Sequence, residues 1–129
     1  MTMILNLTQH SATPDQKKAG VIDLSKENRD VLLPLLNFPS VEATCAIEAR
    51  AEKLANLVDG ASFNTPKPAV MIGGAPYLMG PLEVALARRR YKVVYAFSVR
   101  SSVEVEQSDG TVVKRTVFEH AGFVNGALG

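Results

Sequence analysis

The feature that most constrains the fold is a strand–helix–strand succession in the second half of the chain. The apolar run AVMIG leads into a glycine pair, a helix-like segment continues to about Arg90, and the run KVVYAF follows. Both runs are almost wholly apolar, which is typical of strands in a parallel sheet that helices cover on its faces. Because such strands are joined by a right-handed crossover, the sequence predicts parallel strands near 70–74 and 92–98 in one sheet.

The first sixty or so residues add a strand and three helices to this unit. Residues 3–9 are predicted to be a third strand of the same parallel sheet, and 21–24 a brief extended segment. Capping residues, and a proline at the first helical position, mark where the helices begin. These starts are Thr13-Pro14, Ser25 and Ser40. We expect Pro34 to end or kink the second helix, and the third helix to run to about Val58.

The last part of the chain has a different pattern. Residues 102–107 and 111–120 alternate apolar with polar side chains on either side of Ser108-Asp109-Gly110. Asp-Gly between two alternating segments is the strongest short signal for a β-hairpin. We therefore predict one α/β domain over residues 1–129, a small Rossmann-like open parallel sheet flanked by helices, with a C-terminal hairpin at about 101–120. The loop-like stretch 60–68 is too short to separate two domains.

Composition excludes several classes of function. The chain has 14 Lys and Arg against 13 Asp and Glu, whereas proteins that bind long nucleic acid usually carry a basic excess. Cys45 is the single cysteine, so neither an internal disulfide nor a zinc cluster is expected. No apolar run reaches the roughly 20 residues that span a bilayer, and the first residues lack a signal-peptide pattern. We expect a cytoplasmic protein with no cofactor, no metal and no membrane partner.

Three strand ends supply a candidate site. Ligands of open α/β sheets bind beyond the carboxyl ends of the parallel strands, where the strand order reverses. The glycine pair allows close approach of the backbone, and the helix behind it offers free N–H groups to an anion. We expect a phosphodiester or a nucleotide here, with His10 and Arg100 as candidate catalytic residues. The candidate ligand-binding residues are Thr8, Gln9, Ser11, Gly73, Gly74, Ala75, Ser98 and Ser101.

Each part of this site also has a plainer interpretation. A Gly-Gly step after a strand is more often an ordinary turn, and neither GxGxxG nor the P-loop pattern is present. His10 can pair locally, and Arg100 can be a surface charge. We interpret Arg88-Arg89-Arg90 as structural, because a helix C-terminus favours cations, and His120 as structural too. Three coincident strand ends favour a binding site.

Three segments resemble a known family. They are TQHSATPDQ after the first strand, VMIGGAPYLM, and VVYAFSVRSSVEVEQSDGTVVKRTVFEHAGF. They are similar to the His-containing turn, the glycine turn, and the S/T-x-R step and Phe-x-His motif of the small stand-alone CRISPR-associated ring nucleases, which have a CARF-like fold. The likeness covers both ends of the chain and leaves out 25–68. Ala121-Gly122 departs from the pattern, because the family tends to carry a basic residue there.

The resemblance implies a metal-independent enzyme of antiviral defence that binds and linearises cyclic oligoadenylate second messengers. A 2′-hydroxyl of the ligand would attack the neighbouring phosphate, and His10 would transfer the proton. The N–H groups of Gly73 and Gly74 and the guanidinium of Arg100 would stabilise the developing charge. The resemblance also implies a homodimer, since two-fold symmetry lets one chain supply both halves of a pocket for a ring.

Two other functions stay open. The same pocket could sense or sequester a nucleotide without cutting it, which the missing basic residue favours. Alternatively, the chain is a structural or interaction protein of phage or bacterial origin. In that case the hairpin edge and the segment LLPLLNFP would mediate assembly. Lys114, Arg115 and Glu119 carry charges of the kind that discourage edge pairing.

Overall fold

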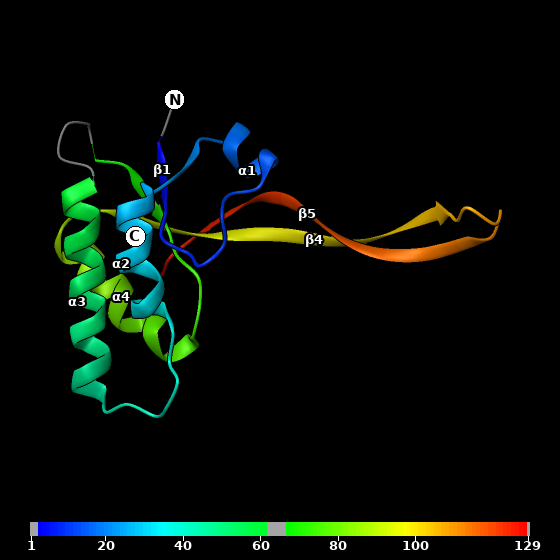
Figure 1. Cartoon of the computed structure of the whole chain (residues 1–129). Helices are drawn as coiled ribbons and strands as arrows, with labels where there is room; N and C mark the ends of the chain where they lie inside the picture. Colours follow the sequence, from blue (N-terminus) through cyan, green and yellow to red (C-terminus); the bar gives the residue numbers. More distant parts are fainter. Residues whose placement is uncertain (1–2, 62–66, 129) are drawn as a thin grey trace.

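The fold is an open, mostly parallel sheet that carries a long antiparallel hairpin. The computed structural model describes residues 3–61 and 67–128. Its elements are β1 (Ile4–Asn6), α1 (Pro14–Lys18), β2 (Val21–Asp23), α2 (Lys26–Leu36), α3 (Thr44–Ala61), β3 (Ala69–Met71), α4 (Pro76–Arg88), β4 (Lys92–Glu106) and β5 (Val112–Asn125). The strand order is β2-β1-β3-β4-β5, and only the pairing of β4 with β5 is antiparallel (Figure 1). The predicted α/β class and the parallel pairing of the three predicted strands are confirmed.

Two apolar clusters lie on opposite faces of the sheet. On one face, Leu5, Val70 and Val93 of three neighbouring strands pack under the buried side of α2, α3 and α4. On the other face, Ala12, which leads into α1, joins a smaller cluster that includes Phe123 of β5. The chain moves from β1 to β2 in one direction and from β3 to β4 in the other. Right-handed crossovers therefore put α1 on one face and α4 on the other.

The predicted starts of the first two helices are confirmed. Thr13 accepts a hydrogen bond from the Gln16 N–H and the Gln16 side chain accepts one from the Thr13 N–H, which is a capping box. Ser25 accepts from the Asn28 N–H at the start of α2. Because each cap satisfies an N–H that a helix leaves free, local sequence alone is enough to place these helix ends.

Pro34 does not end α2 at once, because the helix continues to Leu36. The guanidinium of Arg50 stabilises this C-terminus. Its Nη1 donates to the carbonyls of Pro34 and Leu35 at 3.0 and 3.1 Å and to that of Asn37 at 2.8 Å. These bonds satisfy carbonyls that have no partner within the helix.

The predicted start of α3 at Ser40 is wrong, because α3 begins at Thr44. Among the residues that precede the helix, Glu42 pairs with the Arg50 guanidinium, with Arg50 Nε 2.8 Å from Glu42 Oε1. The Arg50 bond holds the pKa of the Glu42 carboxyl below its usual value, against the opposing effect of burial. The helix also runs past Val58 to Ala61. Of the loop predicted at 60–68, residues 62–66 lie outside the described residues.

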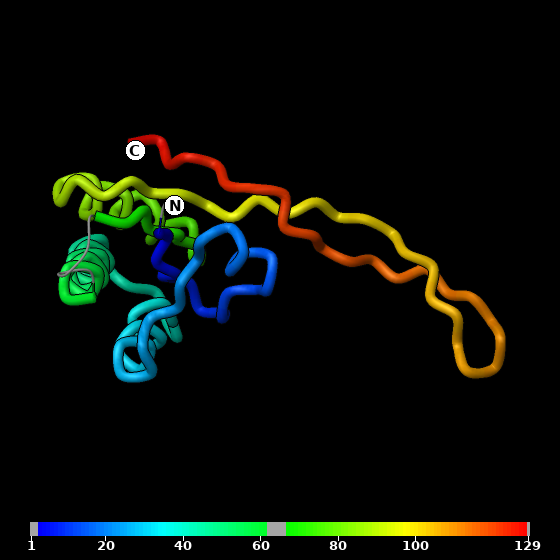
Figure 2. The backbone as a smooth tube through the Cα atoms, turned by 90° about the horizontal axis from the view of Figure 1, so that it is seen from above, coloured from blue at the N-terminus to red at the C-terminus, as the bar shows by residue number. Residues whose placement is uncertain are grey.

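The largest departure concerns the hairpin. The sequence predicts a sheet strand at 92–98 and a separate hairpin at about 101–120, whereas β4 is one strand from Lys92 to Glu106. Its first residues pair with β3, and from Val94 onward it pairs with β5. No glycine or proline interrupts the alternation between 98 and 102, so nothing ends the strand there. The hairpin projects well beyond the helices (Figure 2).

Candidate functional site

A cavity opens at the carboxyl edge of the sheet, between the ends of β1 and β3. Its volume is about 440 Å³. The strands β1 and β3 are neighbours, and from them the chain proceeds toward opposite edges of the sheet, so the cavity lies where the strand order reverses. This is the place at which open α/β sheets bind their ligands. The lining residues are Thr8, Gln9, His10, Leu36, Gly73, Gly74 and Ala75.

The glycine turn leaves backbone donors free at this cavity. Gly74 has a φ of 144°, a conformation that side-chain-bearing residues rarely adopt. The N-cap of α4, Ala75, forms no side-chain cap, and Pro76 occupies the first helical turn. Within 3–61 and 67–128, no acceptor takes a hydrogen bond from the N–H of Gly73, Gly74 or Ala75. Free N–H groups at the start of a helix attract an anion.

A buried asparagine holds the opposite wall of the cavity. Asn6, the last residue of β1, has no exposed surface. Its Oδ1 accepts from the Thr8 N–H at 2.9 Å and from the Thr8 hydroxyl at 2.6 Å. Its Nδ2 donates to the His10 carbonyl and to Asp23 Oδ1, both at 2.8 Å. The turn that carries His10 is therefore held at both ends by one amide, which explains why β1 ends at Asn6 rather than continuing to residue 9.

Asp23 and Arg29 complete this support. Asp23 Oδ1 also accepts from the Ala12 N–H at 2.9 Å, and Arg29 Nη2 donates to the Gln9 carbonyl at 2.9 Å. Burial raises the pKa of the Asp23 carboxyl. The bonds from Asn6 and Ala12, with the charges of Arg29 and Lys17, outweigh burial and hold the pKa below its usual value. The turn thus depends on an ionised Asp23.

This pKa direction predicts how stability changes in acid. A depressed carboxyl pKa contributes stability above the unfolded value of 3.8, and this contribution is lost as the pH falls through the folded pKa. Asp23→Asn keeps the Oδ1 acceptor but has no charge to lose. We expect urea unfolding between about pH 5 and pH 3 to show a smaller loss of stability for Asp23→Asn than for the natural chain. An equal loss in both proteins would contradict this role. Asp15→Asn, at an exposed position of α1, is the control.

The structure brings six of the ten predicted site residues to the cavity and leaves three far along the hairpin. Thr8, Gln9, His10 and the stretch 73–75 line it, and Ser11 follows His10 in the chain. His10 Nε2 lies 3.1 Å from Gln9 Nε2. Ser98, Arg100 and Ser101 belong to β4 beyond its pairing with β3, and they do not line the cavity. The Arg100 guanidinium lies over the Phe118 ring, 5.4 Å from its centroid.

Sequence reasoning missed Asn6, Asp23 and Arg29. One signal was available for the first of these: Asn6 stands between leucines in an otherwise apolar strand. A polar side chain at such a position is expected to be buried and hydrogen-bonded. The other two residues have no comparable local signal, because their partners are far away in the sequence.

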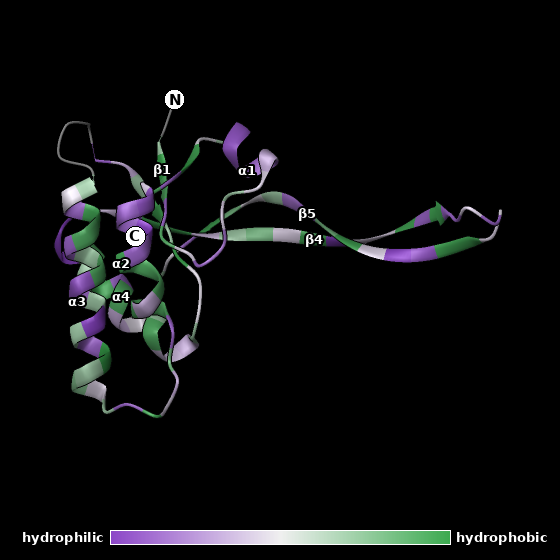
Figure 3. Cartoon of the chain, in the orientation of Figure 1, coloured by the Kyte–Doolittle hydropathy of each residue, from purple (hydrophilic) through white to green (hydrophobic). Residues whose placement is uncertain are grey.

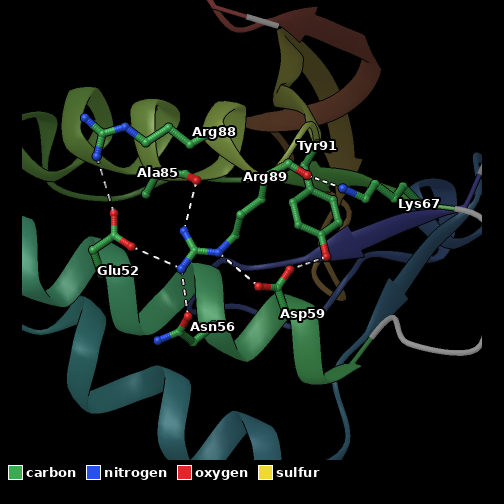
Figure 4. A network of polar contacts seen from close by, with 8 residues as sticks. All are labelled: Glu52, Asn56, Asp59, Lys67, Ala85, Arg88, Arg89 and Tyr91. Carbon is green, nitrogen blue, oxygen red and sulfur yellow. Dashed lines mark hydrogen bonds and ion pairs between the residues drawn. The ribbon is translucent and has the colours of Figure 1, made fainter.

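Arg88 and Arg89 of the arginine triplet belong to a separate network on the surface between α3 and α4 (Figure 4). Arg89 donates to Asp59 at 2.9 Å, to Asn56 at 2.7 Å, to Glu52 at 3.1 Å and to the Ala85 carbonyl at 3.1 Å. The Tyr91 hydroxyl donates to Asp59 at 2.6 Å. Arg89 thus ties the end of α4 to α3. Arg90 has a φ of 64° and is the turn residue that ends the helix.

Another cavity, of about 500 Å³, lies at the corner between α2 and α3. It is lined by Phe38, Ser40, Val41, Glu42, Ile47 and Tyr77. Its one carboxylate, Glu42, is already paired with Arg50. The smaller cavity at the sheet edge is the better candidate, because, unlike the cavity at the helix corner, it combines free backbone donors with an imidazole. No group of three metal-ligating side chains occurs within residues 3–61 and 67–128. None of the helices in these ranges has the length and apolar character needed to cross a membrane.

Fold and cavity together define an open α/β domain with a cavity at its topological switch point. The chain belongs to the uncharacterized protein MJ1673 family, whose model matches residues 2–124. The matched residues include those that line the cavity and almost the whole hairpin. No curated protein and no solved structure matches the chain.

Proposed function

We propose that the cavity binds a small cyclic oligonucleotide and that the protein linearises it without a metal. The observation that carries the proposal is the meeting of free N–H groups at 73–75 with His10 across the switch point of the sheet. Backbone donors suit a phosphodiester, and an imidazole suits proton transfer near neutral pH. The resemblance to the ring nucleases makes cyclic oligoadenylate the first ligand to test, and it favours a homodimer that acts in the cytoplasm.

For the proposed reaction, the protein has mainly to position the ligand and to stabilise the charge that develops on the phosphate. The 2′-oxygen of one nucleotide bonds to the adjacent phosphorus, and the bond from phosphorus to the 5′-oxygen breaks. The products are a 2′,3′-cyclic phosphate and a free 5′-hydroxyl, so the proton of the 2′-hydroxyl is replaced by one delivered to the 5′-oxygen. His10 is the group in the cavity that can carry this proton. The N–H groups of Gly73 and Gly74 would stabilise the added negative charge on the phosphate oxygens.

Binding and product analysis with the full chain test this proposal. Cyclic tri-, tetra- and hexa-adenylate are each incubated with the protein in EDTA, and the products are resolved by mass spectrometry. We expect one ring size to raise the melting temperature and to be converted to a linear product ending in a cyclic phosphate. Binding without conversion would overturn the catalytic part, and absence of binding by every ring would overturn the whole proposal.

A matched pair of glycine variants tests the location. Gly74→Ala forces a methyl group onto a φ of 144° at the cavity, and Gly110→Ala forces one onto a φ of 87° at the hairpin turn. Both variants are strained. We expect only Gly74→Ala to weaken ring binding, by on the order of tenfold or more. Equal binding by the two variants would mean that the ring does not bind at the glycine turn.

A second candidate function is a sensor or sequestering protein with the same cavity. The position of Arg100 favours it, because this guanidinium lies on the hairpin and does not line the cavity of its own chain. The described lining of the cavity then contains one side chain that can transfer a proton, His10, and no cationic side chain that could contact the bound phosphate. Ring binding without cleavage is the result expected of such a protein.

A further inference from the structure

The hairpin of β4 and β5 has an uncovered apolar surface. Its root is attached to the body, because the Tyr95 hydroxyl donates to Glu83 at 2.8 Å. From Phe97 to the turn, the two strands extend away from all four helices (Figures 1 and 2). Phe97, Val99 and Val103 are 51, 46 and 37% exposed. A two-stranded hairpin alone is at best marginally stable in water, so this one needs a cover.

Alternation and register assign these side chains to one side of the hairpin. Residues two apart on a strand share a side, and so do residues directly opposite on paired strands. The side of Val93 and Tyr95, which α3 and α4 cover in the body, continues outward without a helix above it. We name this side the ribbon face. It consists of Phe97, Val99, Ser101, Val103 and Val105 on β4 and Val113, Arg115, Val117, Glu119 and Gly122 on β5.

The opposite side of the hairpin is more polar. It carries Ser98, Arg100, Ser102, Glu104 and Glu106 on β4. The aromatic rings there already have neighbours, since Arg100 lies over Phe118 and His120 packs against Phe123 with ring centroids 4.8 Å apart. Both apolar and polar stretches occur along the arm (Figure 3). Val112 and Phe118 on this side are also exposed, at 59 and 66%. The β4 residues here are polar, however, so the ribbon face is the more continuously apolar side.

The order of residue types along the ribbon face is almost the same in both directions. Its centre is the cross-strand pair Ser101–Val117. On β4, Val99 and Val103 lie one step to either side of this centre, and Phe97 and Val105 lie two steps away. On β5, Glu119 and Arg115 lie one step to either side. A half-turn about an axis through the centre thus exchanges apolar residues with apolar residues and an acid with a base.

Two observations at and near the centre indicate which contacts the ribbon face lacks. The Ser101 hydroxyl is buried, yet it has no hydrogen-bond partner among the described residues. Arg115 and Glu119 form none of the ion pairs present within residues 3–61 and 67–128. Buried hydroxyls are nearly always paired, and complementary charges across a two-fold axis fix the register of an interface.

We propose that a second copy of this chain covers the ribbon face. The two hairpins pack face to face and antiparallel, and the two-fold axis passes through Ser101–Val117 of both. Val99 of each chain then meets the partner's Val103, and Arg115 meets the partner's Glu119 twice per dimer. The two Ser101 hydroxyls lie together on the axis, where they can hydrogen-bond directly or through one water. This interface does not depend on the proposed nucleotide function.

Light scattering of the full chain at about 1–100 µM, the range in which dimers of ordinary affinity dissociate, tests the interface. The natural chain should be a dimer at the upper end of this range. Val103→Asp adds two charges to the ribbon face of a dimer, and we expect it to weaken dimerisation on the order of 100-fold or more. Ser102→Asp adds the same charge at the next position, on the opposite side, and should have little effect. A monomeric natural chain, or equal effects of the two variants, would overturn the proposal.

Charge reversal tests the two-fold register. Arg115→Glu alone places like charges across the axis twice, as does Glu119→Arg alone, so each should weaken the dimer. Mixing the two single variants in equal amounts restores opposite charges at both contacts, and a mixed dimer should form. The double variant should also recover. If neither the mixture nor the double variant regains the dimer, Arg115 and Glu119 do not meet across an axis and this register is wrong. Circular dichroism confirms that each variant is folded.

Discussion

Replacing His10 by alanine should lower the rate of ring opening by about 10²–10⁴-fold while changing ligand affinity only a few-fold. His10 lies in the lining of the cavity, and its backbone carbonyl is fixed by Asn6. The substitution therefore removes the imidazole but leaves the turn's hydrogen bonds in place. Single-turnover cleavage with excess enzyme measures the chemical step, and a separate titration at equilibrium measures binding.

The second histidine of the chain provides the control. His120→Ala removes the same side chain from β5, where His120 contacts Phe123 and lies outside the cavity lining. We expect normal cleavage by this variant. Added imidazole should restore part of the rate to His10→Ala, because a free base can enter the space that the substitution leaves. If His10→Ala cleaves at the natural rate, proton transfer belongs to another group.

Replacing Asn6 by leucine should lower the free energy of unfolding by about 3 kcal/mol. Leucine has a similar volume, so the core stays filled. The change removes the Asn6 partner of the Thr8 N–H, of the Thr8 hydroxyl and of the Asp23 carboxylate, and it leaves the His10 carbonyl with only the Thr8 hydroxyl as a donor. Each buried polar group without a partner costs roughly 1–3 kcal/mol, and access of water to the turn returns part of this cost. Urea unfolding followed by circular dichroism gives the difference.

The same substitution at an exposed strand position shows how much of the loss of stability comes from the burial of the Asn6 amide. Asn125→Leu, at the end of β5, should alter stability by no more than about 0.5 kcal/mol. Asn6→Leu should also weaken ring binding, since the turn that carries His10 loses two of its supports. Equal stability of the two variants would mean that the Asn6 amide does not hold the turn.

Local signals in the sequence predict most of the fold. The capping residues Thr13 and Ser25 place two helix starts, and the apolar runs around 70 and 93 give the parallel sheet. Prediction fails where distant partners decide the outcome. The third helix starts late because the segment before it reaches back to Arg50, which stabilises the end of α2.

The candidate site was only partly predictable for the same reason. Strand ends at 8–10 and 73–75 meet as the rule for open sheets requires. Arg100 does not join them, because β4 keeps its alternation past the sheet and carries Arg100 out along the hairpin. The bond from Asn6 to Asp23 joins two neighbouring strands, and no spacing rule in a single sequence identifies such a pair.

The continuity of β4 has a consequence for the order in which the molecule folds. β4 and β5 are joined by a short turn, so their pairs form between residues near in the sequence, and hairpins close in about 1–10 µs. The strand β1 must instead wait for β3, which follows three helices later, and such distant pairings form slowly. The residues Lys92–Val94 at the base of the hairpin are then available to pair with β3. Chains that meet through their hairpins before the sheet is complete would finish folding already attached to each other.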